Sequence, residues 1–231
     1  MRSRNVAFAA NGLKPFTKHY HYLDSGQPDI FPKLTEIEMS SGTFKVFEDA
    51  RIELSGIQVG LVRVQKPNHK FGDANRPDVG AGLGAPNVLV EECDVDPFDR
   101  DRPAPSSSYS ATSKIFNCDT NALANLEKYY GYVMKGAKIV GQESGAVATV
   151  TSIDLWSDSW GDCMGAFYFR DPNATPQPPD LFFTGTKTYR ITAAGEGSLP
   201  LPGSTVLASD ASGTYSGTGT ILTQELSLIH I

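Results

Sequence analysis

The sequence is short of the residues that define several common protein classes. Its three cysteines, Cys93, Cys118 and Cys163, stand far apart with no CxxC spacing. This odd, scattered set argues against a disulfide framework and against a zinc knuckle, and predicts reduced thiols in a chain made in a cytosol. No apolar run approaches the roughly 20 residues of a membrane helix, and the N-terminal apolar stretch is too short for a secretory signal. We therefore expect a soluble protein that is not exported by the general route and does not enter a membrane.

Positive charge and apolar residues are also scarce. The chain has 20 Lys and Arg against 26 Asp and Glu, and its net charge of −6 gives no electrostatic reason to bind nucleic acid. Only 40% of the residues are apolar, which argues against a single deep core. In contrast, 22 Gly and 15 Pro indicate many turns between short strands. This composition predicts a mainly all-β protein of small barrel or sandwich modules, with one short helix and long loops.

Changes in composition along the chain predict its domain organisation. The predicted units are an N-terminal β unit at 1–41, a small barrel-like module at 42–154, a C-terminal β module at 155–225 and a non-native tail at 226–231. The tail reads LSLIHI, which looks like a translated sequencing adapter. We therefore expect the natural protein to continue past Glu225, and we assign no role to His230.

The barrel-like module is predicted from two hairpins and one helix. Residues 43–66 read as two strands that turn at Ser55-Gly56, with Gly60 as a candidate bulge. Residues 132–154 read as a second hairpin that turns at Ser144-Gly145, and we expect it to pair with the first. Between the hairpins, 67–118 is an irregular excursion. The helix is expected at 119–130, with Asp119 or Thr120 as N-cap and an apolar stripe of Leu123, Leu126 and Tyr130.

An ordered series of segments carries a family resemblance. The series runs through MRSRNVAFAANGLKPFTKHYHYLDSG, PKLTEIEMSSGTFKVFEDARI, SYSATSKIFNCDTNALA, YYGYVMKGAKIVGQESGAVATVTSIDLWSD and WGDCMGAFYFRDPN. In this order it resembles large tail-fibre-like virion structural proteins of T4-like phages of cyanobacteria, over nearly all of residues 1–225. The resemblance implies an elongated, oligomeric, fibre- or baseplate-associated protein, commonly a trimer, of which this chain is the N-terminal part. It implies no catalytic residues and no cofactor.

The chain departs from the family pattern at one turn. The pattern has Gly-Glu after SGTF-x-V, where this sequence has Phe47-Glu48. Because a glycine tolerates turn conformations that other residues avoid, its loss leaves the geometry of this turn open.

Two histidines form a weak metal-binding candidate. His19 and His21 share one face of a predicted strand, because side chains alternate along a strand. Several such pairs around an oligomer axis could bind a transition metal, although one chain supplies only two ligands. The simpler interpretation is that both imidazoles face solvent beside Tyr20 and Tyr22.

Two further groups have both a functional and a plain interpretation. The acidic run of Asp94, Asp96, Asp99 and Asp101 lacks the glycine and closing Glu of a calcium loop, so a solvated loop is favoured. Trp156 and Trp160 could stack on a glycan, but burial at a junction between modules is favoured.

Three functions from different classes are open at this point. The favoured one is a virion structural protein, made in the host cytoplasm, that is not an enzyme and acts by oligomerising with other copies of itself and with other tail proteins. The alternative is a carbohydrate-binding module that recognises a host surface glycan. A glycan-degrading enzyme ranks third, because it would need paired carboxylates in a cleft.

Overall fold

The structure is built almost entirely of short antiparallel strands, which confirms the predicted all-β class. The computed structural model describes residues 5–67, 70–71, 91–92, 95–96, 99–103, 106, 108–125, 128–158, 161–170, 182, 185–194 and 210–217. Its strands are β1 Asn5–Ala10, β2 Lys18–Leu23, β3 Asp29–Pro32, β4 Leu34–Ser41, β5 Asp49–Leu54, β6 Ile57–Arg63, β7 Lys70–Phe71, β8 Glu91–Glu92, β9 Val95–Asp96, β10 Asp99–Pro103, β11 Ile115–Asn117, β12 Lys138–Gly141, β13 Val147–Ser152, β14 Leu155–Trp156, β15 Cys163–Tyr168, β16 Gly185–Thr192 and β17 Asp210–Gly217. The helix is α1 Thr120–Asn125.

The largest sheet has six strands in the order β11-β4-β13-β12-β5-β6. Both predicted hairpins belong to it, and β12 pairs with β5 as expected. Ser55 and Gly56 both have positive φ, as the tight turn between β5 and β6 requires. The ladder shifts between the Ile52–Gly60 and Glu53–Gln58 pairs and leaves Val59 as the extra residue, so a bulge is present directly beside Gly60.

This sheet is not the closed barrel that the sequence suggested. Its edge strands, β6 and β11, are not paired with each other along their length. Among the described residues they approach each other just beyond the end of each strand, where an isolated bridge joins Val64 to Cys118. The sheet is therefore open, because its two edge strands form no ladder with each other.

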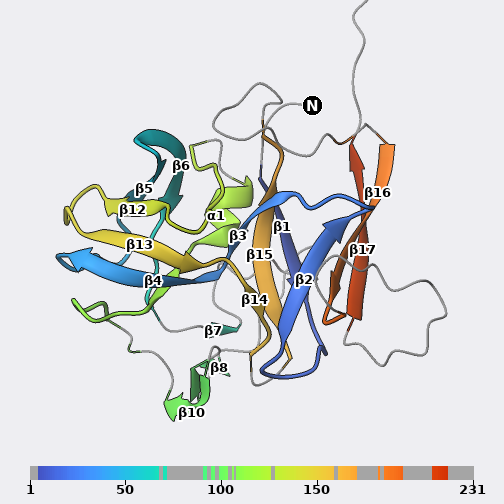
Figure 1. Cartoon of the computed structure of the whole chain (residues 1–231), viewed down its shortest axis with the longest axis horizontal. Coiled ribbons are helices and arrows are strands. Elements are labelled where there is room, and N and C mark those ends of the chain that lie inside the picture. Colours follow the sequence, from blue (N-terminus) through green and yellow to red (C-terminus); the bar gives the residue numbers. More distant parts are fainter. Residues whose placement is uncertain are drawn as a thin grey trace, which may run out of the picture.

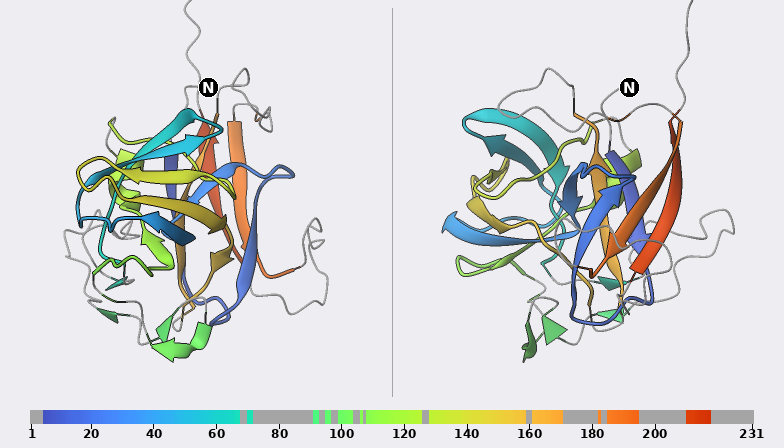
Figure 2. Two further views of the ribbon diagram at one scale, coloured as in Figure 1. Left: turned by 60° about the vertical axis from the view of Figure 1, so that its left-hand side comes forward. Right: turned by 45° about the vertical axis from the view of Figure 1, so that its right-hand side comes forward.

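Two smaller sheets pack on one another beside the large one. One has the order β1-β15-β3 and the other the order β14-β2-β16-β17. Figure 1 shows the six-stranded sheet at the left, β2, β16 and β17 at the right, and β1 and β15 between them. The right-hand view of Figure 2 shows the same separation of β16 and β17 from the six-stranded sheet.

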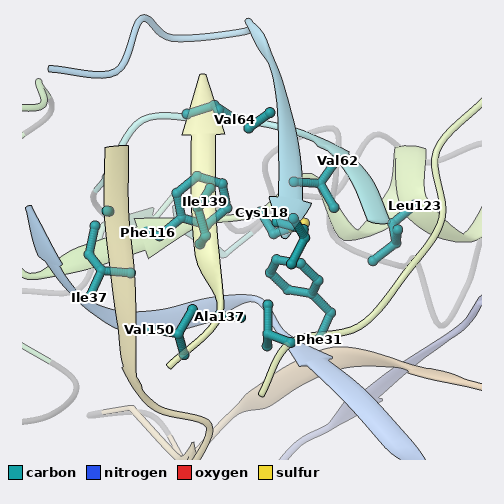
Figure 3. Close-up of a cluster of buried hydrophobic side chains, with 14 of the residues drawn as sticks. Phe31, Ile37, Val62, Val64, Phe116, Cys118, Leu123, Ala137, Ile139 and Val150 are labelled. Carbon is teal, nitrogen blue, oxygen red and sulfur yellow. The ribbon is translucent and has the colours of Figure 1, made fainter. Parts of the chain in front are cut away.

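The central strand β15 is buried on both faces. Its Ala166 belongs to the core under the six-stranded sheet, whereas Phe167 belongs to the core shared with the four-stranded sheet. Strand β3 behaves in the same way, with Phe31 facing one core and Ile30 the other. Figure 3 shows Phe31 beneath the cluster formed with residues of the large sheet. The fold thus has layered sheets with two apolar cores and a shared middle layer.

Strand pairing crosses the predicted domain boundaries at residues 41 and 154. Strands β1 and β3 pair with β15, and β2 pairs with β14 and β16, so both ends of the described chain build one sandwich. Strand β4, by contrast, joins the six-stranded sheet. The boundaries in composition therefore differ from the boundaries in packing, because partners about 150 residues apart leave no local signal.

The helix begins where predicted and is shorter than predicted. Asp119 caps α1, since its Oδ1 accepts a hydrogen bond from the backbone N–H of Ala122 at 2.8 Å. Leu123 is buried, but Tyr130 is outside the helix and forms a bridge with Leu61, so its expected place on the helical stripe is wrong. Leu126 lies outside the described residues. In the described part of the chain, no helix is long and apolar enough to cross a membrane.

Candidate functional site

The two histidines of β2 each lie beside a backbone carbonyl of their own chain. His19 is buried, and its Nδ1 lies 2.8 Å from the carbonyl oxygen of Thr17. His21 Nε2 lies 2.9 Å from the carbonyl oxygen of Pro28. Burial lowers the pKa of both imidazoles. Within the described ranges no group of three or more His, Cys, Asp or Glu side chains could hold a metal ion.

For His19, the burial of the side chain corrects both sequence interpretations. His19 is enclosed within one chain, so it cannot reach an oligomer axis and does not face solvent either. Each imidazole instead satisfies a nearby backbone carbonyl, which is a structural role.

The tryptophan candidate stays a prediction. Trp156 is half-buried at the end of β14, opposite Lys18. It lines a cavity of about 20 Å³, which has room for one water molecule and none for a sugar ring. Trp160 lies outside the described residues, as do Cys93 and Asp94. The side chains of Asp96, Asp99 and Asp101 are not described, so the acidic run stays a prediction.

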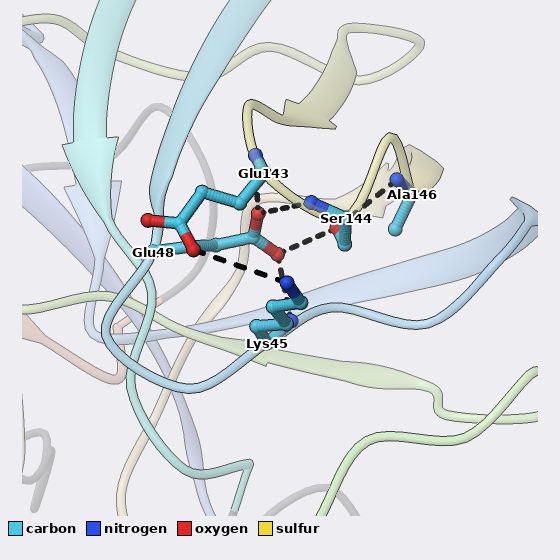
Figure 4. Close-up of polar contacts among 5 residues, drawn as sticks. All are labelled: Lys45, Glu48, Glu143, Ser144 and Ala146. Carbon is cyan, nitrogen blue, oxygen red and sulfur yellow. Dashed lines mark hydrogen bonds and ion pairs between the residues drawn. The ribbon is translucent and has the colours of Figure 1, made fainter.

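A buried carboxylate organises the turn before β5. Glu48 is 1% exposed. Its two oxygens accept hydrogen bonds from the N–H of Lys45 at 2.7 Å, the N–H of Glu143 at 3.0 Å, and the N–H and Oγ of Ser144 at 2.9 and 2.6 Å. Figure 4 shows the Glu48 carboxylate enclosed between the Lys45 loop and the turn that follows β12. The side chain therefore ties together two turns that are 95 residues apart in the sequence.

The hydrogen bonds decide the ionisation of Glu48. Burial alone raises the pKa of a carboxyl group, because it penalises the charged form. Here the donors from Ser144, Lys45 and Glu143 outweigh burial, and the pKa of Glu48 lies below its ordinary value. The group is consequently an anion with four donors at neutral pH, and not a proton donor for catalysis.

The residue before this carboxylate has an unusual backbone. Phe47 has φ of 68°, in the left-handed region that costs a side chain about 1–2 kcal/mol. Two contacts hold it there: its N–H donates to the carbonyl of Val64 at 2.8 Å, and Glu48 fixes the next residue. The ring of Phe47 is 62% exposed. The turn thus adopts a left-handed conformation that a glycine would tolerate without penalty, with an aromatic side chain held out in solvent.

Two other exposed apolar groups lie on strand β6 or are bridged to it. Among the described residues the large exposed apolar side chains are Phe47, Ile57 at 49% and Tyr130 at 38%. Ile57 begins β6, and Tyr130 is bridged to Leu61 of the same strand. Strand β6 is an edge of its sheet. Phe47 lies at the open end of the β5–β6 hairpin beside Val64, whereas Ile57 lies at its turn end. The hairpin with Phe47, Ile57 and Tyr130 spread along it, which we call the β6 edge surface, is the candidate functional site.

Sequence reasoning missed most of this site. It placed Phe44 to Leu54 on one continuous strand, but Val46 and Phe47 form a turn and β5 begins only at Asp49. The one available signal was the difference at Phe47 from the Gly-Glu pattern of the proteins that the sequence resembles. Nothing local marked Glu48 as buried, because three of its four donors come from Glu143 and Ser144 in a distant turn.

Comparisons with known proteins add nothing to this geometry. No family model, no curated protein and no solved structure matches the chain.

Proposed function

We propose that the chain is a structural component of a virus particle, a tail-fibre or baseplate-associated protein that docks to its neighbours. The observation that carries the proposal is the exposed, strained Phe47 on the β6 edge surface. The ordered resemblance to tail-fibre-like virion proteins supports the class of particle.

The energetic balance at Phe47 favours a partner. The left-handed backbone costs about 1–2 kcal/mol, which a glycine would avoid. In the isolated chain the exposed ring makes few contacts that could offset this strain energy. Burying a Phe side chain in an interface contributes about 1.5–3 kcal/mol, which offsets the strain. Strained residues of this kind persist where the surrounding structure holds them and where function uses them.

Edge position supports the same proposal. The first part of β6, from Ile57 to Gln58, is exposed and has no outer partner among the described strands. A free strand edge offers backbone donors and acceptors to another protein. Aromatic anchors beside such an edge are typical of interface centres.

The proposal is tested by identifying the proteins in purified phage particles. Phage particles that carry the gene would be purified by density gradient and their proteins identified by mass spectrometry. We expect peptides of this chain in the particle fraction, together with tail and baseplate proteins. Abundant peptides in infected-cell lysate with none in particles would overturn the proposal.

A further inference from the structure

A second surface lies between the two smaller sheets. A slot of about 330 Å³ separates β1, the edge of one sheet, from β17, the edge of the other. It is lined by all of residues 6–10 and 211–215, so the backbones of both strands border it. Phe167, Tyr189 and Ile191 complete its lining. Figure 2 shows β17 as the outermost strand of its sheet.

Three observations indicate that the slot is incomplete. No described strand pairs with the outer edge of β1 or of β17. The hydroxyl group of Tyr189 is buried without a hydrogen-bond partner, a rare condition in folded proteins. A Cβ added to Gly213 would meet no atom within 4 Å, although its neighbours Ala211 and Tyr215 are partly buried against the core.

An extended polypeptide strand fits this slot better than a small molecule does. The volume is at the lower end for small-molecule pockets. A compact apolar ligand would cover the rings of Phe167 and Tyr189 but would leave the backbone groups of β1 and β17 without partners. A strand supplies both requirements, since its main chain pairs with a free edge and its alternate side chains enter the slot.

The residues of β1 and β17 favour a second copy of the chain as the partner. The chain carries a net charge of −6, so two copies repel each other over most of their surface. Strand β1 has no charged residue, and Asp210, the one charged residue of β17, is held by Arg190 at 2.7 Å. Neither strand has the lysine or proline that usually protects an edge from self-pairing. At these two edges, therefore, like-charged copies meet no unpaired charge of the strands themselves.

We propose that the slot between β1 and β17 receives an edge strand of a second copy of this chain. The inference rests on the proposed function as a particle component and gives it a self-association surface, separate from the β6 edge surface.

Two variants of the full chain test the inference by light scattering after size-exclusion chromatography over a range of concentrations. Gly213→Leu fills the slot from inside, and its backbone tolerates a side chain because φ is not positive. Thr214→Lys places a charge on the exposed edge of β17. The matched control is Thr186→Lys, which adds the same charge at an exposed position of the inner strand β16.

The wild type and Thr186→Lys are expected to form a discrete oligomer whose mass rises with concentration to a plateau. Both slot variants should elute at the mass of one chain, with unchanged circular dichroism. If Gly213→Leu misfolds, Thr214→Lys alone decides. A wild type that is monomeric at every concentration, or slot variants that associate as the wild type does, would overturn the inference. A monomeric chain that is still found in particles would overturn the inference and leave the proposed function standing. A slot-dependent oligomer that is absent from particles would support the inference and overturn the proposed function.

Discussion

At the scale of single residues, Phe47 destabilises the turn before β5 and Glu48 stabilises it. The backbone of Phe47 is strained, and the hydrogen bonds to Glu48 and from Phe47 to Val64 hold that strain in place. The stability of the isolated chain and its ability to dock should therefore respond in opposite directions to changes at Phe47.

Phe47→Gly is expected to raise the free energy of unfolding by roughly 0.5–1 kcal/mol. It removes the left-handed penalty of about 1–2 kcal/mol and adds the smaller entropic cost of a glycine. Urea denaturation measures the change. The control is Phe47→Ala, which loses the ring but keeps the strain and should not stabilise. Equal stability of the two variants would contradict a strained Phe47.

Glu48→Gln is expected to lower the free energy of unfolding by about 1–3 kcal/mol at neutral pH, because an amide cannot accept all the hydrogen bonds. The pKa of Glu48 is depressed in the folded state, so its stabilisation is present above the ordinary pKa of about 4.3 and is lost as pH falls through the folded pKa. The difference between variant and wild type should therefore shrink in acid.

The matched control for Glu48 is its neighbour in the same network. Glu143→Gln changes an exposed carboxyl whose ion pair with Lys45 is 4.0 Å long, and it should alter stability by less than about 0.5 kcal/mol. Denaturation curves at several pH values compare the two variants. If the loss of unfolding free energy in Glu48→Gln stays constant down to strongly acid pH, the ionised Glu48 carboxylate is not what joins the two turns.

His19 gives a second pH dependence, of the same sign and in another range. Burial depresses its pKa, so the unfolded state takes up the proton first as pH falls below the ordinary value of about 6.5. Stability of the wild type should decline there, and His19→Gln should show a smaller decline. At pH 8 the imidazole is neutral in both the folded and the unfolded protein. A difference in stability between variant and wild type at that pH therefore reports the loss of packing and not the loss of a titrating group. Identical slopes in the two proteins would show that His19 does not titrate on unfolding.

At the scale of elements, a close backbone crossing fixes β6 against the segment after α1. Leu61 and Tyr130 exchange two backbone hydrogen bonds of 2.8 and 2.9 Å, and Gly131 lies directly on Gly60. Asn5 of β1 reaches the same point, since its amide group pairs with both backbone groups of Gly131 at 2.7 and 2.8 Å. The crossing thus joins the large sheet to the middle layer.

Gly131→Ala is expected to cost about 1–3 kcal/mol through overpacking, in addition to backbone strain. Its Cβ would lie 2.7 Å from the carbonyl oxygen of Val59, and its φ is +124°. Gly136→Ala separates the two effects, because Gly136 has φ of +86° but open space around it. In thermal unfolding, the melting temperature of Gly131→Ala should be well below that of Gly136→Ala. Equal losses would mean that the crossing relaxes freely.

Elements of this kind were only partly predictable from the sequence. The hairpins were found because Ser55-Gly56 and Ser144-Gly145 are local turn signals and the flanking strands alternate. The helix end was missed because Tyr130 is drawn to Leu61, a contact 69 positions away that periodicity cannot register. Phe47 and Glu48 were missed for the same reason, since their conformation depends on Val64 and on the Ser144 turn.

At the scale of the whole molecule, one strand organises the architecture. Strand β15 pairs with β1 and β3 and contributes to both apolar cores, so neither core is complete without the middle layer. Two surfaces remain open around this arrangement: the β6 edge surface on the large sheet and the slot between β1 and β17. A thin, layered β protein with two such surfaces is suited to assembly, because each surface can contact a different neighbour.

Hydroxyl-radical footprinting of Phe47 tests the proposed docking most directly. The oxidation rate of this ring would be measured in the isolated chain and in intact particles, with half-buried Tyr168 as an internal reference. The docking account predicts fast oxidation in the isolated chain and strong protection of Phe47 in the particle. Equal oxidation of Phe47 in both samples would contradict it.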